Sequence, residues 1–348
     1  MNLRRRLTLL IVLLLAAGAV ALAWLLWRAT PPKTARLLPD ADGYFYIDVA
    51  TLRRAGALNN LPAVEEAPDY RAFIDATGIR PERDLDTAAF AIHTPQTGGD
   101  DTRFSEVFTG HVDRRRATDY FRKIAEHNPT YHDVEIFFIA HEGRTVRVAF
   151  LNDHAMAVSN SASDDAIYTI IDRSRRFRPV RGPALLREYY DEAPLTSLAW
   201  LIMRVEGLPQ QSAILSSQLR QMLAGAVLVG SVRYLGSLEV RLQALTESES
   251  QAQQLAENAN GLLQIYRAAE TSLQAGGSDT DVKSALRSLR VEQQGSQVTL
   301  AADIPTRVLQ KLLTASEAET APAAIPPVQK RAPASSTHAR RQREKRTK

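Results

Sequence analysis

The N-terminal segment constrains the fold most strongly, because Leu7–Trp27 is a run of 21 residues without a charge. As an α-helix that rises about 1.5 Å per residue, this run is about 30 Å long, which matches the hydrocarbon core of a bilayer. Arg4–Arg6 precede it, and positive charge beside a membrane helix favours the cytoplasmic side. We therefore predict a cytoplasmic basic head at residues 1–6, a transmembrane signal-anchor at residues 7–27 and an extracytoplasmic body.

A cleaved signal peptide is the alternative interpretation of this segment. Ala21-Leu22-Ala23 has the small-x-small pattern of a cleavage site, with Leu7–Val20 as the apolar region before it. The apolar run continues to Trp27, however, where signal peptides usually become polar, so an uncleaved anchor is favoured. A buried core helix does not fit, because no face of the segment is polar. Both remaining interpretations export the body and predict a cell-envelope protein. With the favoured anchor, the protein is single-pass in the membrane and its body is periplasmic.

Composition and charge exclude several classes of protein. The 348 residues include no cysteine, which removes disulfide frameworks, thiol nucleophiles, iron–sulfur clusters and cysteine-based zinc sites. The formal net charge of +4 is unevenly distributed, because residues 1–28 carry +4 and residues 329–348 carry +7. The body between these two ends is therefore mildly acidic, which argues against a nucleic-acid partner.

The body alternates between helices and hairpins, which predicts an α+β fold with antiparallel sheets of hairpins packed by helices. After a linker at residues 28–36, we place one α+β domain at residues 37–180 and a second at residues 181–315. Both follow the order strand, helix, hairpin, helix, hairpin, helix. Internal duplication is one explanation, and the ordinary alternation of an α+β protein is the other.

Strands are expected at 42–48, 86–93, 104–112, 133–140, 145–151, 155–159, 197–205, 226–234, 237–244, 291–293 and 297–302. Helices are expected at 68–77, 113–127, 163–175, 210–223, 248–274, 282–289 and 305–313.

The C-terminal segment at residues 316–348 is rich in Ala, Pro, Ser, Thr and basic residues and has no aromatic residue. Such a segment cannot bury enough apolar surface to offset the entropy of ordering, so we predict a disordered basic tail. Its positive charge suits a polyanion such as anionic lipid or envelope polysaccharide, and a solubilising end is the alternative. The basic stretch at Arg173–Arg181 could contact anionic head groups in the same way.

No linear motif identifies a catalytic, cofactor or metal site. His132, His141 and His154 could converge on neighbouring strands, with Asp133 or Asp153 as a further ligand, but zinc-site spacing is absent. The run Ser159–Asp165 is dense in hydroxyls and carboxylates, yet a helix start capped by Ser163 accounts for it. We therefore assign no catalytic residue, no cofactor and no metal ligand.

The opening Leu38-Pro39-Asp40-Ala41-Asp42 and the stretches Leu38–Val49 and Val229–Ala244 resemble uncharacterised exported, membrane-anchored bacterial proteins of unknown function. The resemblance covers most of residues 1–314 and implies an exported body of helices and hairpins, but no activity. We expect a non-enzymatic binding or scaffold protein whose partner is an envelope protein, a glycan or an anionic lipid. The alternatives are an envelope hydrolase without a recognisable motif and a lipid or lipoprotein carrier.

Overall fold

The structure, a computed structural model, describes residues 30–56, 68–94, 101–176, 180–194, 196–207, 217–234, 237–272, 284–285 and 287–305. The predicted anchor at Leu7–Trp27 and the predicted tail at residues 316–348 lie outside these ranges, as does nearly all of the helix expected at 305–313. Within the described ranges, no helix combines the length and the apolar character needed to span a bilayer.

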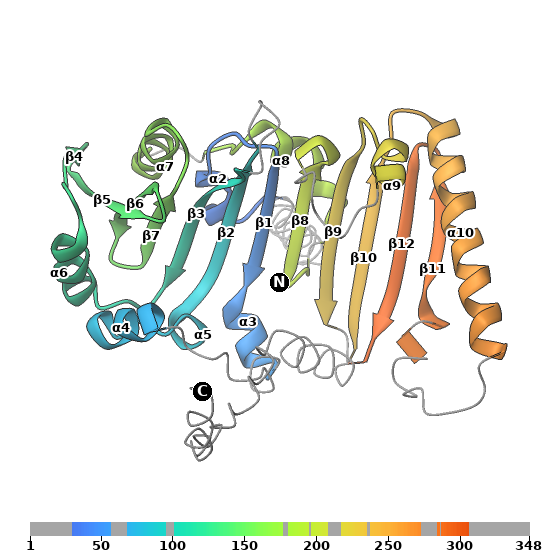
Figure 1. Ribbon diagram of the computed structural model, residues 1–348, viewed down its shortest axis with the longest axis horizontal. Helices are drawn as coiled ribbons and strands as arrows, with labels where there is room; N and C mark the ends of the chain where they lie inside the picture. Colours follow the sequence, from blue (N-terminus) through green and yellow to red (C-terminus); the bar gives the residue numbers. More distant parts are fainter. Residues whose placement is uncertain are drawn as a thin grey trace, which may run out of the picture.

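One antiparallel sheet of twelve strands extends across the whole molecule (Figure 1), in the order β11-β12-β10-β9-β8-β1-β2-β3-β7-β6-β5-β4. The predicted α+β class, with antiparallel hairpins packed by helices, is therefore confirmed. The strands are β1 Gly43–Asp48, β2 Leu85–His93, β3 Arg103–Gly110, β4 Thr130–Tyr131, β5 Val134–His141, β6 Arg144–Asn152, β7 Ala155–Ser159, β8 Ala199–Arg204, β9 Val227–Tyr234, β10 Leu238–Leu245, β11 Arg290–Gln294 and β12 Gln297–Ile304.

The hairpins form where turn residues separate alternating apolar segments. Glu142 and Gly143 join β5 to β6 with φ values of 50° and 73°, so both turn residues are left-handed, as a two-residue turn between twisted strands requires. Gly295, with φ of 56°, turns β11 into β12. Side chains alternate between the two faces along every strand, so the pairing registers fix which residues share a face.

The two halves of the chain meet at the centre of the sheet, where β1 pairs with β8 and Phe45 lies opposite Leu201. From this centre, β1, β2 and β3 lead outward to β7, β6 and β5 on one side. On the other side, β8, β9 and β10 lead outward to β12 and β11. In each half a long helix precedes the outer hairpin. A single sheet therefore continues across the boundary at 180/181 that the sequence suggested.

Several helices pack on one face of the central sheet, and we call this the inner face. Its core contains Tyr44, Val107 and Ile202 from the sheet, together with Ile170 of α7 and Leu186 of α8. Within the described ranges, the helices are α2 Lys33–Leu37, α3 Val49–Arg54, α4 Pro68–Thr77, α5 Pro81–Asp84, α6 Arg114–Ile124, α7 Asp165–Arg175, α8 Ala184–Tyr189, α9 Ser217–Met222 and α10 Glu249–Ser272, with short 3₁₀ turns at Tyr190–Glu192 and Val205–Gly207.

The opposite face is covered only at its two ends by the described helices. At one end, Phe73 of α4 and Phe121 of α6 pack on Phe137, Val148 and Phe150 of the outer strands. At the other end, the sheet packs against α9 and α10 through Leu228, Ala244 and Val298, which meet Leu223, Ala252 and Leu255. Figure 1 shows α4, α6 and α10 at opposite ends of the sheet, with the central strands between them.

Helix α6 ends earlier than its sequence suggested. The pattern predicted a helix from Asp113 to about His127, whereas α6 stops at Ile124. The backbone beyond it pairs with β5 instead, since the Glu126 N–H donates to the Phe138 carbonyl at 2.8 Å and the Phe138 N–H donates to the His127 carbonyl at 3.0 Å. At the other end of the helix, the Asp113 carboxylate accepts from the Arg116 N–H, as expected for an N-cap.

Candidate functional site

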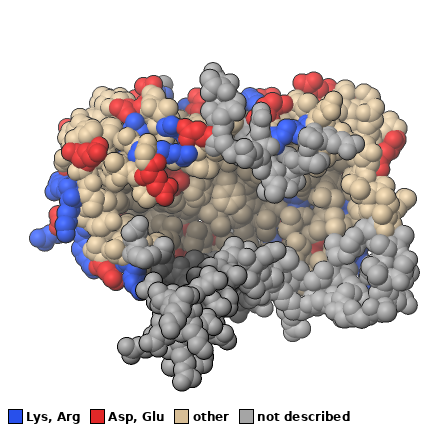
Figure 2. All heavy atoms as spheres, viewed as in Figure 1, with Lys and Arg blue, Asp and Glu red and all other residues tan. Residues whose placement is uncertain are grey.

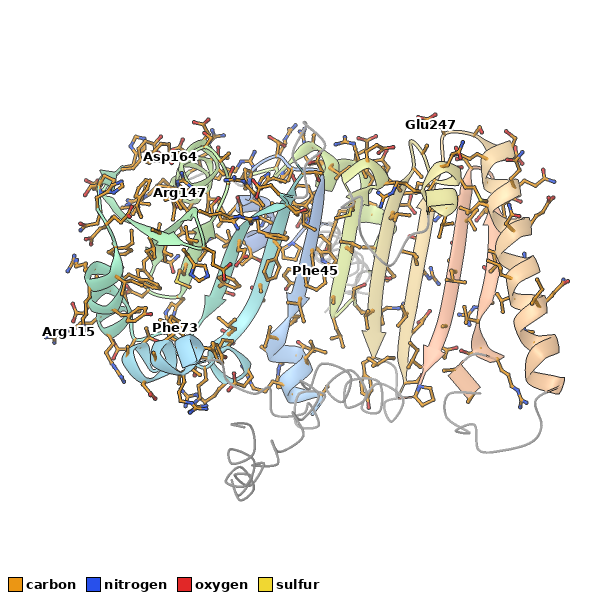
Figure 3. All side chains as sticks on the ribbon, viewed as in Figure 1. Phe45, Phe73, Arg115, Arg147, Asp164 and Glu247 are labelled. Atoms are coloured by element: carbon orange, nitrogen blue, oxygen red, sulfur yellow. The ribbon has the colours of Figure 1, made fainter. Side chains whose placement is uncertain are left out.

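The most distinctive surface is the open face, which we define as the side of β3, β2, β1, β8, β9 and β10 opposite the inner face. Across six strands spaced about 4.8 Å apart it is roughly 24 Å wide, and helices about 10 Å thick form its two walls. Figure 2 shows a hollowed, mainly uncharged surface across the middle of the molecule, and Figure 3 places Phe45 at its centre. The registers assign to this face Phe104, Glu106, Phe108, Ala88, Phe90, Ile92, Gly43, Phe45, Ile47, Ala199, Leu201, Met203, Gly230, Val232, Tyr234, Leu238, Val240 and Leu242.

The open face is exposed to an unusual degree for an apolar surface. Among the described residues, Phe104 is 36% exposed and Leu242 is 38% exposed, although both belong to central strands. Among the described residues, the exposed large hydrophobic side chains belong to the open face or to the helices that flank it. They are Phe104, Tyr234 and Leu242 of the sheet, Tyr70 of α4, Ile124 of α6, and Leu262 and Ile265 of α10.

Among the residues assigned above to the open face, Glu106 is the charged one. It lies opposite Phe90 on β2 and opposite Val158 on β7, and the same strand places Phe104 and Phe108 on either side of it. Burial among these apolar groups raises the pKa of the Glu106 carboxyl from 4.5 to about 7. Near neutral pH this carboxyl therefore exchanges between its neutral and charged forms.

The aromatic rings beside Glu106 form a continuous row across three strands. The ring centroids of Phe45 and Phe90 are 5.7 Å apart, and those of Phe90 and Phe108 are 5.8 Å apart at an edge-to-face angle of 84°. Phenyl rings in this row expose both apolar edges and electron-rich faces. The row leads from the carboxyl to the centre of the sheet.

A second polar constellation lies on the inner face, where it is sealed from solvent. The His93 Nε2 atom is 2.9 Å from the Ser105 hydroxyl, which is 2.9 Å from the Ser159 hydroxyl. Both serines are 0% exposed, so no substrate can reach either oxygen in this conformation. Burial also lowers the pKa of His93. We interpret this chain of hydroxyls as a satisfied polar element of the core.

The histidines that could have formed a metal site lie apart. His132 faces Asp172 at 3.6 Å, His154 packs edge-on to His111 with ring centroids 5.9 Å apart, and His141 ends β5. Over the ranges that the structure describes, no three potential ligands gather closely enough to hold a metal ion.

The hydroxyl-rich run Ser159–Asp165 leads into helix α7, as the sequence suggested, but the N-cap residue is Asp164 rather than the predicted Ser163. The Ser163 hydroxyl accepts from the Asp165 N–H at 3.1 Å and donates to the Asp165 carboxylate at 2.6 Å. Asp164 pairs with Arg147, whose guanidinium also donates to the Ser161 carbonyl. These contacts fix α7 to the sheet (Figure 3).

Several arginines of the basic run Arg114–Arg116 and of the stretch Arg173–Arg181 have internal partners. Arg114 pairs with Asp153 at 2.9 Å, and Arg116 donates to the carbonyls of Asp75 and Ala76. Arg173 donates to the Leu38 carbonyl and so ties α7 to the opening segment of the body.

Sequence reasoning did not single out Glu106. A usable signal is present, because Phe104, Glu106 and Phe108 occupy alternate positions of one predicted strand. This spacing places a carboxylate between two phenyl rings on one face.

Comparisons with known proteins supply little further information. No protein-family model matches the chain, and a search of curated proteins finds no match. Among solved structures, TP0453 in crystal form IV aligns with a TM-score of 0.45 and 15% identity, over 83% of this chain and 98% of that chain. Its crystal form I aligns with a TM-score of 0.42 and 12% identity, over 82% and 98%.

Proposed function

We propose that the chain is a membrane-anchored binding protein of the cell envelope, and that its open face binds a lipid-like, apolar small molecule. The observation that carries this proposal is the partly exposed apolar surface, which spans six central strands between helical walls. Removing apolar area from water stabilises a complex by about 25 cal/mol per Å². Apolar surfaces of this extent are rare on soluble domains unless they bind something.

The composition of the open face favours an apolar ligand over a glycan. Of its side chains, only Glu106 and Tyr234 are polar. A glycan needs many hydrogen-bonding partners, because each hydroxyl that loses water must be satisfied. A lipid-like, apolar ligand needs few hydrogen-bonding partners.

A hydrolase is less well supported. The histidine–serine contact that most resembles catalytic machinery lies on the inner face, with Ser105 fully buried. The open face itself offers one carboxyl and no partner acid or base among the described residues. Binding without chemistry is therefore the function we propose.

The mirrored strand order also leads us to propose that residues 37–180 and 181–315 are two copies of one α+β unit. Each half is a three-strand meander, then a long helix, α6 or α10, and then a set of outer strands of which the last, β7 or β12, returns beside the meander. The first half has two further strands, since β4 precedes the β5–β6 hairpin and β7 follows it. Both long helices pack on the same side as the open face, and so form its two walls.

Binding at the open face can be tested with a charge placed at its exposed edge. In the full chain in lipid nanodiscs, we expect Leu242→Lys to weaken binding of the uncharged dye N-phenyl-1-naphthylamine about tenfold or more, because the ammonium must lose water when the dye binds. Empty nanodiscs correct for partition of the dye into lipid. Gln294→Lys, which adds the same charge at an exposed position of β11, is the control. Equal dye affinity in the two variants and the parent would contradict the proposal.

Topology is tested separately. If Leu7–Trp27 is an anchor with its N-terminus inside, a reporter that is active only outside the cytoplasm should be active when fused after Lys348. A reporter active only in the cytoplasm should be silent at the same point. The reverse pattern would refute the orientation, and the mass of the mature N-terminus distinguishes an anchor from a cleaved signal peptide.

A further inference from the structure

Glu106 differs from the other carboxylates of the sheet in having no partner among the described residues. Glu239 on the inner face has Arg233 at 2.5 Å, and Glu135 on β5 has Arg122 at 2.6 Å. Over the described part of the chain, the Glu106 carboxyl makes no hydrogen bond or ion pair. A buried charge without a partner is costly, and proteins normally pair it or hydrogen-bond it.

The surroundings of Glu106 are suited to a cation with an apolar body. Phe90 lies opposite it, and Phe104 and Phe108 lie two residues away on either side. Side chains at such positions are about 5–7 Å apart, close enough for one small group to contact the carboxylate and the rings together. Phenyl faces attract cations, and cages of aromatic rings recognise quaternary ammonium groups.

We propose that the Glu106 carboxylate and the rings of Phe90, Phe104 and Phe108 form the head-group site for an alkylammonium amphiphile. Its apolar chain lies along the open face toward Phe45 and Leu201. This inference rests on the proposed function and adds to it the charge and the position of the ligand's polar end.

Other ligand chemistries fit the site less well. A metal ion needs several oxygen or nitrogen ligands, and Glu106 is a single carboxyl among hydrocarbon groups. An anionic amphiphile would place like charges together once Glu106 ionises. An uncharged amphiphile would fit the hydrocarbon surface but leave the carboxylate unpaired.

The experiment compares two probes that share a ten-carbon chain. Binding of decyltrimethylammonium and of decyl maltoside is measured by calorimetry at pH 8.5, below their micellar concentrations, with the full chain in nanodiscs. Empty discs correct for partition into lipid. The variants are Glu106→Gln, which removes the charge at constant shape, and Glu292→Gln, which removes an exposed charge on β11.

We expect Glu106→Gln to bind decyltrimethylammonium about tenfold more weakly than the parent, because a charge-assisted contact is lost. Both proteins should bind decyl maltoside equally, and Glu292→Gln should match the parent for both probes. Phe108→Leu should lower the affinity for decyltrimethylammonium about threefold and leave the affinity for decyl maltoside unchanged. The substitution removes a ring face but keeps the side chain nearly as apolar.

The outcomes separate the two proposals. If decyl maltoside binds but Glu106→Gln leaves the affinity for the cation unchanged, the head-group site is refuted and the apolar binding face stands. If neither probe binds the parent, the proposed function itself fails. Loss of both probes in Glu106→Gln would also overturn the head-group site, because a charge effect cannot remove an uncharged ligand.

Discussion

Replacing Glu106 with glutamine should make the protein more stable at pH 8, by about 2 kcal/mol, and change its stability little at pH 4. The cause is the burial of the carboxyl among phenyl rings, which raises its pKa from 4.5 to about 7. Each pKa unit corresponds to about 1.4 kcal/mol, so this shift sets an upper limit of roughly 3.4 kcal/mol on the difference in unfolding free energy between variant and parent. Partial solvent access reduces this value, and glutamine keeps the shape without the charge.

The direction of the pH dependence follows from proton binding. Below pH 4.5 both states of the parent hold the proton, and its full stability is present. Between pH 4.5 and 7 the unfolded chain has released the proton that the folded chain keeps, so the parent loses stability as pH rises. Above pH 7 both states are ionised, and the loss stays constant. The glutamine variant lacks this loss, so the difference between the two proteins grows from pH 4.5 to 7.

Urea titrations of the full chain in nanodiscs at pH 4, 6 and 8, followed by near-ultraviolet circular dichroism, measure the difference. The stacked Tyr46 and Trp200, with ring centroids 5.5 Å apart, supply a folded-state signal. Other titrating groups, including His93, contribute equally to parent and variant and cancel. Glu292→Gln should show no such trend. A difference that is independent of pH would mean that Glu106 is not desolvated in the folded protein.

A carboxyl that lowers stability and has no partner in the described part of the structure is typical of a functional group. Selection on stability alone would replace it, because glutamine or an apolar residue would be more favourable at this position. Perturbed carboxyls of this kind cluster at binding and catalytic sites. The predicted gain in stability on substitution and the predicted loss of cation affinity are therefore two consequences of one arrangement.

The local elements of this fold were predictable from the sequence, because hairpins depend on nearby residues. The segments around Glu142-Gly143 and Gly295 carry both the alternation and the turn residues of a hairpin. The pairing of β1 with β8 was not predictable, since it joins residues about 155 positions apart with no turn between them. The single continuous sheet therefore emerged only from the structure.

Which face of the sheet is left open could not be predicted from the sequence either. Strand β10 has the clearest alternation in the chain, with Leu238, Val240, Leu242 and Ala244 on one side, which suggests that this side is buried. In the structure Ala244 packs under α9 and α10, whereas Leu242 is 38% exposed. Gln243 on the other face is buried. Alternation defines two faces, but the path of the distant helices decides which of them is covered.

Truncation of two adjacent residues of β8 should lower stability by very different amounts. Ile202 points to the inner face and is 0% exposed within the central core. Ile202→Ala should lower the free energy of unfolding by about 3–4 kcal/mol, because it removes buried methyl groups and leaves a cavity. Leu201 points to the open face, opposite Phe45 and opposite Gly230, which has no side chain. Leu201→Ala should therefore cost about 1 kcal/mol or less.

Ligand binding should show the reverse order. Leu201→Ala removes apolar contact area at the centre of the open face, so the affinity for decyl maltoside should fall about tenfold. Ile202→Ala should bind the probe like the parent under conditions where it is folded. Urea titration and calorimetry on the same nanodisc preparations measure both quantities. If Leu201→Ala were as destabilising as Ile202→Ala, the two faces of β8 would be packed alike in the native protein. The open face could then not admit a ligand without unfolding part of the structure, and both proposals about this face would fail together.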